Sequence, residues 1–94
     1  GFGNSSLETL LLLEPDIAKI DRCMIDGVAC NRGQRRTLDK LVACLSSLNL
    51  EIVAEGVERN EDAQVVWDAG IQFAQGYLWG RPTLVELDYP KSLG

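Results

Sequence analysis

Short apolar runs of strand length alternate with segments of helical periodicity along this 94-residue chain, and that alternation limits the possible folds more than any other feature. Runs rich in β-favouring residues predict strands at 17–20, 50–54 and 71–74. Between them, apolar residues at helical spacing predict one helix from about 34 to 48 and another that stops at Gly70. Regular alternation of this kind indicates an α/β fold with a parallel sheet.

Local signals predict where further helices begin and end. Asn60 is expected to cap the helix that precedes Gly70, with Glu61 and Asp62 at the positive end of its dipole. Near the N-terminus, Ser5-Ser6-Leu7-Glu8 has the form of a capping box, which predicts a helix to about Leu13, closed by Pro15. A last helical turn is expected at 84–87.

Three strands cannot close a barrel, and a three-stranded parallel sheet would leave two unpaired edges and a thin core. We therefore expect residues 1–94 to be part of a larger α/β domain. The remainder would come from missing chain, from a partner or from another copy of the chain. The absence of Met at position 1 also indicates a piece of a longer protein.

The composition argues against several classes of function. Fourteen acidic residues against nine Lys and Arg give a net charge of −5, which disfavours binding to a nucleic-acid polymer or an anionic lipid surface. Without His, and with three scattered cysteines, the chain cannot build a zinc site or a His-based triad. The unpaired cysteines predict small buried residues or idle thiols in the reducing cytoplasm. No apolar run is long enough for a membrane segment.

Unusual polar residues fall where the predicted strands end. Lys19 and Asp21 close the first strand, Glu55 the second and Gln75 the third, and alternation puts one polar group of each strand on the same face. Because sites in parallel α/β folds lie at this rim, these groups could bind a phosphate ester or a metal. The glycines that follow Glu55 and Gln75 would let the backbone approach a ligand. Each polar residue alone also fits a solvated strand end.

Four ordered motifs resemble the C-terminal third of the EAL domain family over nearly the whole chain. They are Lys19-Ile20-Asp21-Arg22, Val53-Ala54-Glu55-Gly56-Val57-Glu58, Gln75-Gly76-Tyr77-Leu78 with Gly80-Arg81-Pro82, and the start Gly1-Phe2-Gly3-Asn4-Ser5-Ser6-Leu7. An ungapped alignment puts Gly1 directly after the family's Asp-Asp-Phe element. The E-A-L motif and the paired aspartates then belong upstream of residue 1.

The resemblance implies a C-terminal fragment of a modified (β/α)8, TIM-like barrel, about three β/α units, with residues 1–94 as the C-terminal portion of one EAL domain. It implies a cyclic di-GMP phosphodiesterase (a hydrolase that yields linear pGpG) working with two Mg²⁺ or Mn²⁺ ions. Lys19 matches the lysine at the attacking water and scissile phosphate, and Glu55 matches a catalytic, metal-binding glutamate. Gln75 and Asp21 match positions near the substrate. Glu58 is expected to support a neighbouring loop.

The resemblance further implies a bacterial, cytoplasmic signalling enzyme that forms a homodimer. Because most metal ligands belong upstream, we expect residues 1–94 alone to be inactive. One alternative is a degenerate EAL-like domain that binds cyclic di-GMP or a protein partner without catalysis. Another is an autonomous α/β unit that oligomerises to cover its strand edges.

Overall fold

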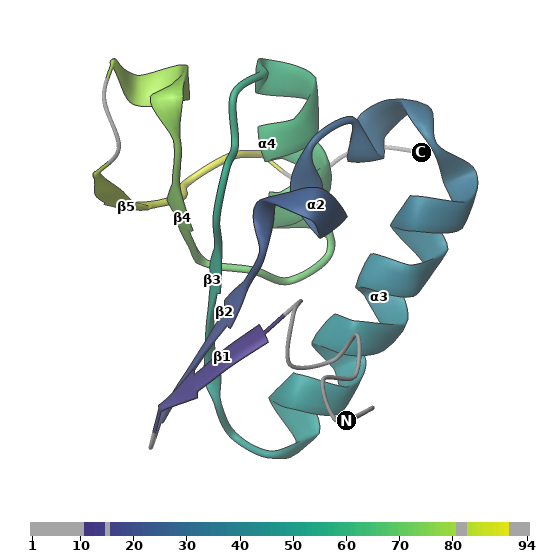
Figure 1. The fold of residues 1–94 in the computed structure, drawn as a ribbon, viewed down its shortest axis with the longest axis vertical. Helices are drawn as coiled ribbons and strands as arrows, with labels where there is room; N and C mark the ends of the chain where they lie inside the picture. The colour runs from purple at the N-terminus through teal and green to yellow at the C-terminus, as the bar shows by residue number, and fades with distance from the viewer. Residues whose placement is uncertain (1–10, 15, 81–82, 91–94) are drawn as a thin grey trace, which may run out of the picture.

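The structure is a computed structural model that describes residues 11–14, 16–80 and 83–90. Its elements (Figure 1) follow in the order β1 (Leu11–Glu14), β2 (Ile17–Ile20), α2 (Arg22–Ile25), η1 (Val28–Cys30), α3 (Arg32–Ser47), β3 (Glu51–Ala54), α4 (Asn60–Asp68), β4 (Phe73–Gln75), η2 (Tyr77–Trp79) and β5 (Leu84–Glu86), where η marks a 3-10 helix. The alternation of helices and strands predicted from the sequence is therefore present between β2 and β4.

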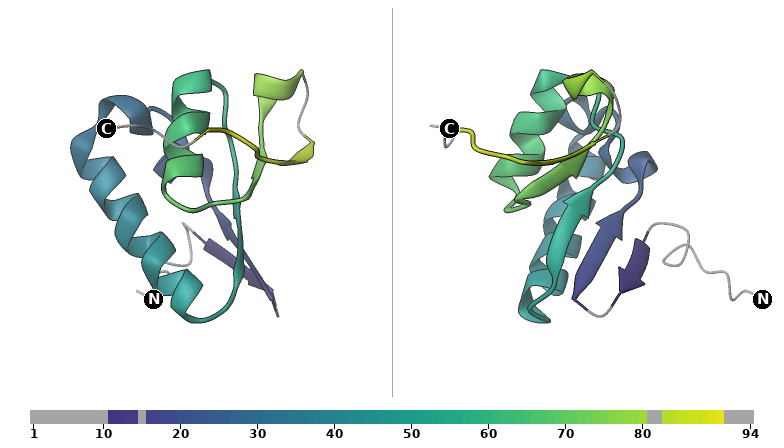
Figure 2. Two further views of the ribbon diagram at one scale, coloured as in Figure 1. Left: turned by 180° about the vertical axis from the view of Figure 1, so that it is seen from behind. Right: turned by 90° about the vertical axis from the view of Figure 1, so that its left-hand side faces the viewer.

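The five strands of the described residues form one sheet in the order β1-β2-β3-β4-β5. β2 pairs parallel with β3, and β3 pairs parallel with β4, which confirms the predicted parallel sheet. The two outer strands run antiparallel to their neighbours. Figure 2 shows the arrow of β1 pointing against those of β2 and β3. The parallel strands therefore have antiparallel strands on both sides.

Both outer strands correct predictions of helix. Leu11–Glu14 was expected to end a helix, but it pairs with Ile17–Ile20 as a strand, and the capping box at 5–8 lies outside the described residues. Leu84–Glu86 was expected to be helical, but it pairs with Phe73–Gln75. In both cases backbone pairing with a neighbouring strand outweighs the local preference, because a short segment gains more hydrogen bonds from a sheet edge than from one helical turn.

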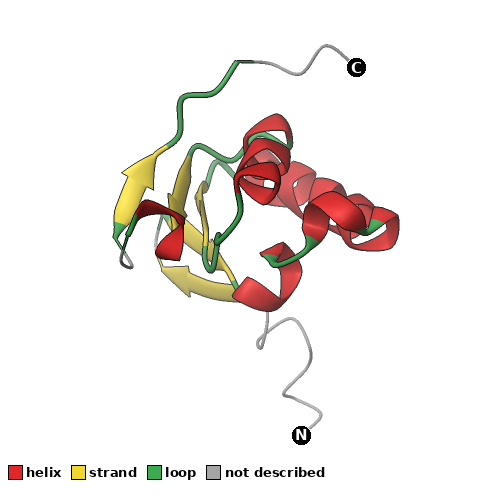
Figure 3. Ribbon diagram, turned by 90° about the horizontal axis from the view of Figure 1, so that it is seen from above, coloured by secondary structure: helices red, strands yellow, loops and turns green. Residues whose placement is uncertain are grey.

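One face of the sheet makes the hydrophobic core. Ala18, Ile20, Ile52, Ala54 and Ala74 are buried on it and belong to a single apolar cluster with residues of the helices. Figure 3 shows α3 and α4 together on one side of the strands. The sheet is thus covered by helices on one face.

The opposite face carries the other residues of each strand. Lys19 stands opposite Val53, and Val53 stands opposite Phe73, so the three share a face. Val53 is buried but lies outside the main apolar cluster. The described helices α3 and α4 leave this second face uncovered.

The long helix α3 begins two residues before the predicted start. The side chain of Asn31 accepts a hydrogen bond from the backbone N–H of Gln34 at 2.9 Å, which caps the helix there. Leu38, Val42 and Leu45 form the buried face of the helix, which packs toward the sheet.

No described helix is long and apolar enough to cross a membrane.

The ends of α4 agree with the sequence in part. Gly70 follows the helix with φ of +102°, as expected for a glycine after a helix end, and its N–H donates to Trp67 O at 3.0 Å. The prediction that Asn60 is the N-cap is wrong. Arg59 occupies the cap position with extended backbone and no capping side-chain bond, and Asn60 is the first helical residue.

The cysteines and Trp67 were expected to be core or idle residues. Cys23, Cys30 and Cys44 are free thiols, as predicted, but all three are exposed rather than buried. Trp67 is half-buried and packs against the apolar cluster.

Candidate functional site

The side chains predicted for the site lie at the carboxyl ends of the three parallel strands. Lys19 is in register with Val53, and Glu55 and Gln75 come two residues after Val53 and Phe73, so all three polar side chains belong to the uncovered face. Glu55 and Gln75 lie two residues, or about 7 Å, further toward the carboxyl ends of the strands than Lys19. The structure therefore brings Lys19, Glu55 and Gln75 to one rim, as the sequence predicted.

The charged groups of this rim are open to interaction. Lys19, Glu55 and Gln75 are each half-buried. Within 11–14, 16–80 and 83–90, neither the Lys19 ammonium nor the Glu55 carboxylate has an ion-pair partner. A cation and an anion held on rigid strands without internal partners can both contact a polar ligand.

Asp21 has a structural partner at this rim. One of its carboxylate oxygens accepts the backbone N–H of Cys23 at 2.9 Å and so caps α2. Loss of solvent around the sulfur and the Asp21 carboxylate together raise the pKa of the Cys23 thiol. Asp21 therefore fixes the chain leaving β2, and its contact with substrate remains a prediction.

The connection after β3 is locked to the connection after β2 by close contact. Gly56 has φ of +81°, and a Cβ added there would lie 2.5 Å from the Cβ of Arg22. The Arg22 guanidinium then reaches Glu58 at 3.2 Å. Gly56 thus leaves room for a neighbouring side chain, which is a structural reason for glycine there. Glu58 forms a largely exposed ion pair with the neighbouring connection, and its supporting role stays a prediction.

The connection after β4 is locked to the connection after β3 in a similar way. Val57 donates its N–H to Gln75 O at 3.0 Å, and Val57 O accepts the N–H of Leu78 at 3.2 Å. Gly76 lies so close to Val57 that an added Cβ would overlap the Val57 backbone. This glycine therefore allows close backbone contact between the two connections.

Asp62 is the residue of this region that the sequence did not reveal. Its carboxylate is 1% exposed and accepts the backbone N–H groups of Gly27 and Ala29, both at 2.9 Å. Arg59 lies 3.7 Å from Asp62 and 3.4 Å from Asp26. The sequence showed only an acid in the first turn of a helix. Such an acid is equally typical of an exposed residue that interacts with the helix dipole.

A metal ion at the rim would need several oxygen ligands close together. Carboxylate and amide oxygens suit hard divalent ions, and Glu55 and Gln75 supply one of each. The described residues nevertheless contain no group of three His, Cys, Asp or Glu side chains placed to hold a metal ion. These residues do not by themselves fit a metal centre, and any further ligands would have to come from outside them.

Comparison with known sequences gives a consistent result. The family model of the EAL domain matches residues 1–82. The probable cyclic di-GMP phosphodiesterase PdeD of Escherichia coli is 38% identical over 93 residues, which cover 99% of this chain and 17% of that protein. The bifunctional diguanylate cyclase/cyclic di-GMP phosphodiesterase MucR of Pseudomonas aeruginosa is 38% identical over 86 residues, or 92% of this chain and 13% of that protein. The chain therefore spans less than a fifth of either relative.

Solved structures agree with the sequence comparison. The EAL domain of Mycobacterium smegmatis DcpA superposes with a TM-score of 0.72 at 34% identity, covering 89% of this chain and 38% of that one. A cyclic di-GMP complex of the PaMucR phosphodiesterase superposes with a TM-score of 0.62 at 38% identity, covering 69% and 26%. The expected α/β fold, a part of a TIM-like barrel domain, is confirmed. By the matched motifs and the shared fold, this chain belongs to the EAL domain family.

Proposed function

We propose that the protein containing this chain hydrolyses cyclic di-GMP to linear pGpG, and that residues 1–94 form the C-terminal portion of its EAL domain. The observation that supports this proposal is the rim that carries Lys19, Glu55 and Gln75 together. The names of the relatives, several of them cyclic di-GMP phosphodiesterases, agree with it.

Each rim residue has a proposed task that follows from its chemistry. The Lys19 ammonium holds the attacking water and neutralises charge on the scissile phosphate, since no acid among the described residues pairs with it. Gln75 donates and accepts hydrogen bonds that orient the dinucleotide. In the reaction water adds to phosphorus, one phosphoester P–O bond breaks, and the departing sugar oxygen takes up a proton.

We propose that Glu55 supplies one carboxylate ligand to a site for Mg²⁺ or Mn²⁺ whose remaining ligands lie outside the described residues. Two such ions in the complete domain would stabilise charge on the phosphate oxygens. Because the described residues offer no closed group of ligands, we expect residues 1–94 alone not to hydrolyse cyclic di-GMP. We propose a cytoplasmic bacterial enzyme that acts as a homodimer.

The test is the Lys19→Ala variant of the complete protein. We expect hydrolysis to fall about 100-fold or more, because a charge aimed at the reacting phosphate is lost, while binding of cyclic di-GMP weakens only modestly. Lys40→Ala is the matched control, since it removes the same charge from an exposed position of α3.

Unchanged turnover in Lys19→Ala would remove this lysine from the mechanism. Tight binding of cyclic di-GMP by the unmodified protein, with no hydrolysis in the presence of Mg²⁺ or Mn²⁺, would contradict the enzyme proposal. That result would indicate instead a degenerate EAL-like domain that senses the nucleotide.

A further inference from the structure

A basic groove runs along the first turns of α3, on the helical layer rather than on the uncovered face of the sheet. Its volume is about 540 Å³, and its lining comes from η1 and α3. Among the described residues that line it, three are Arg32, Arg35 and Arg36, and Asp39 is the one acid. We propose that this groove binds a phosphate-bearing small molecule.

The charge of the groove is opposite to that of the chain. The chain has a net charge of −5 and only nine Lys and Arg in 94 residues, yet three of them line this one groove. Arginines three or four positions apart in a helix are neighbours, so their charges repel one another when no anion is present. A bound anion would relieve that repulsion.

The internal ion pairs leave most of this charge available. Arg35 reaches Asp39 at 3.4 Å, but both side chains are exposed, and such pairs contribute little to stability. Arg32 and Arg36 have no acidic partner in the described part of the chain. An incoming anion therefore competes with one weak pair only.

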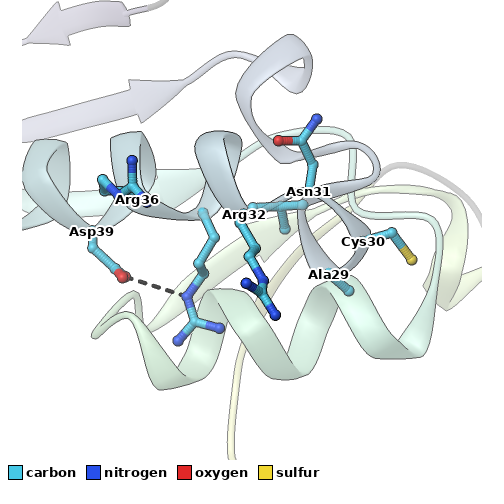
Figure 4. A pocket seen from close by; sticks show the side chains of 8 residues that line it. Ala29, Cys30, Asn31, Arg32, Arg36 and Asp39 are labelled. Atoms are coloured by element: carbon cyan, nitrogen blue, oxygen red, sulfur yellow. Dashed lines mark hydrogen bonds and ion pairs between the residues drawn. The ribbon is translucent and has the colours of Figure 1, made fainter.

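The spacing of the side chains along the helix favours one shared ligand. Figure 4 shows Arg32 among the side chains that line the groove, and Arg35, three positions further along the same helix, also lines it. Two planar guanidinium groups on neighbouring positions of one helix can each donate N–H groups to the oxygens of one phosphate. Arg32 and Arg35 are thus the expected phosphate contacts.

The position in the fold adds to this preference. Arg32 is the first residue of a 16-residue helix, where the helix dipole is positive. The volume of the groove falls in the range of about 300–1,000 Å³ typical of sites for small molecules. The acidic surface of the rest of the chain disfavours a nucleic-acid polymer, so a small phosphate ester or a pyrophosphate group is the chemistry that fits.

The inference does not depend on the proposed hydrolysis, because the groove and the rim share no residue. The test is calorimetric titration of the complete protein with inorganic pyrophosphate at constant ionic strength and without added divalent ions. We expect saturable binding that weakens at least tenfold in the Arg32→Gln/Arg35→Gln double variant. The matched control Lys40→Gln, which removes a charge of α3 outside the groove lining, should change the affinity less than twofold.

A Lys19→Ala variant separates this groove from the rim. Pyrophosphate affinity should be the same in Lys19→Ala as in the unmodified protein. Loss of binding in that variant would assign the anion to the rim and overturn the proposal, as would absence of saturable binding or equal weakening by Lys40→Gln.

A charge-retaining variant keeps the test decisive if the double variant unfolds. Arg32→Lys/Arg35→Lys preserves the net charge but lacks the planar fork, so we expect affinity to fall severalfold while circular dichroism stays unchanged. Unaltered affinity in that variant would show that the groove attracts anions by charge alone and does not form the proposed site.

Discussion

The buried carboxylate of Asp62 accepts the backbone N–H of Gly27, 35 residues earlier in the chain, at 2.9 Å. The same carboxylate accepts the backbone N–H of Ala29, so the first turn of α4 fixes the turn that leads into α3. Together with the Arg22–Glu58 ion pair and the Gly76–Val57 contact, it joins the connections that follow β2, β3 and β4. The rim that carries Lys19, Glu55 and Gln75 therefore rests on connections that are tied to one another.

Replacement of Asp62 should destabilise the fold strongly. In Asp62→Ala the N–H groups of Gly27 and Ala29 lose their acceptor, and we expect the free energy of unfolding to fall by about 2–4 kcal/mol. Asp62→Asn keeps one oxygen acceptor and should cost less than Asp62→Ala. Urea unfolding followed by circular dichroism measures both.

Glu61→Ala is the control for Asp62, because Glu61 is an exposed acid in the same helical turn. Its free energy of unfolding should change by less than about 0.5 kcal/mol. Equal losses for the two alanine variants would mean that a dipole effect at the helix end, not the two buried hydrogen bonds, explains the role of Asp62.

We expect replacement by alanine to change the stability in opposite directions at Gly76 and at Gly33. A methyl group at Gly76 would overlap the Val57 backbone, so Gly76→Ala should lower the free energy of unfolding by about 2 kcal/mol or more. At Gly33, in the first turn of α3, an added Cβ would meet nothing closer than Asn31 Oδ1 at 3.5 Å. Gly33→Ala should be neutral or stabilise by up to about 1 kcal/mol, because Ala is the better helix former.

Thermal unfolding of the two glycine variants checks this pair of predictions. A Gly76→Ala protein as stable as the unmodified one would mean that the connections after β3 and β4 are not in contact in solution. Destabilisation by Gly33→Ala would contradict the assigned helix start.

The sequence predicted the parallel strands well because each is a compact apolar run whose pattern is local. Ile17–Ile20 was predicted with its observed bounds, whereas the third strand, predicted at 71–74, is found at Phe73–Gln75. Alternation along the strands predicted the common face of Lys19, Glu55 and Gln75. In the parallel register, Ala54 stands opposite both Ile20 and Ala74. The carboxyl ends of the three strands therefore meet at one edge of the sheet, and their polar side chains lie on the same face there.

Features that depend on distant partners could not be predicted in this way. β1 and β5 pair with the edges of β2 and β4, and this pairing could not be predicted from their own short sequences. The role of Asp62 depends on a turn 33 to 35 residues away. Gly56 is needed because Arg22 packs against it, and this contact between distant residues is not visible in the local sequence pattern.

Leu38 and Leu48 should differ in how much they stabilise the fold. Leu38 is fully buried on the inner face of α3, whereas Leu48, directly after the helix, is 63% exposed. Leu38→Ala removes packed methyl groups and leaves a cavity, so we expect the free energy of unfolding to fall by about 2–5 kcal/mol. Leu48→Ala should cost less than about 1 kcal/mol by the same denaturant measurement. A larger loss for Leu48 would mean that the α3 face is inverted in solution or that another chain covers Leu48.

The Asp21 carboxylate should slow alkylation of Cys23. A raised thiol pKa means that less thiolate, the reactive form, is present at a given pH, and the loss of solvent around the sulfur and the Asp21 charge both act in that direction. Asp21→Asn removes the charge but can still cap α2, so the pKa of Cys23 should fall and its reaction with iodoacetamide at pH 8 should become about two- to fivefold faster. Mass spectrometry of the three cysteine peptides measures the rates, with Cys30 and Cys44 as internal references and Asp26→Asn as the control that removes another acid of the same connection. An unchanged Cys23 rate in Asp21→Asn, or an equal acceleration in Asp26→Asn, would show that the Asp21 carboxylate does not govern the reactivity of this thiol.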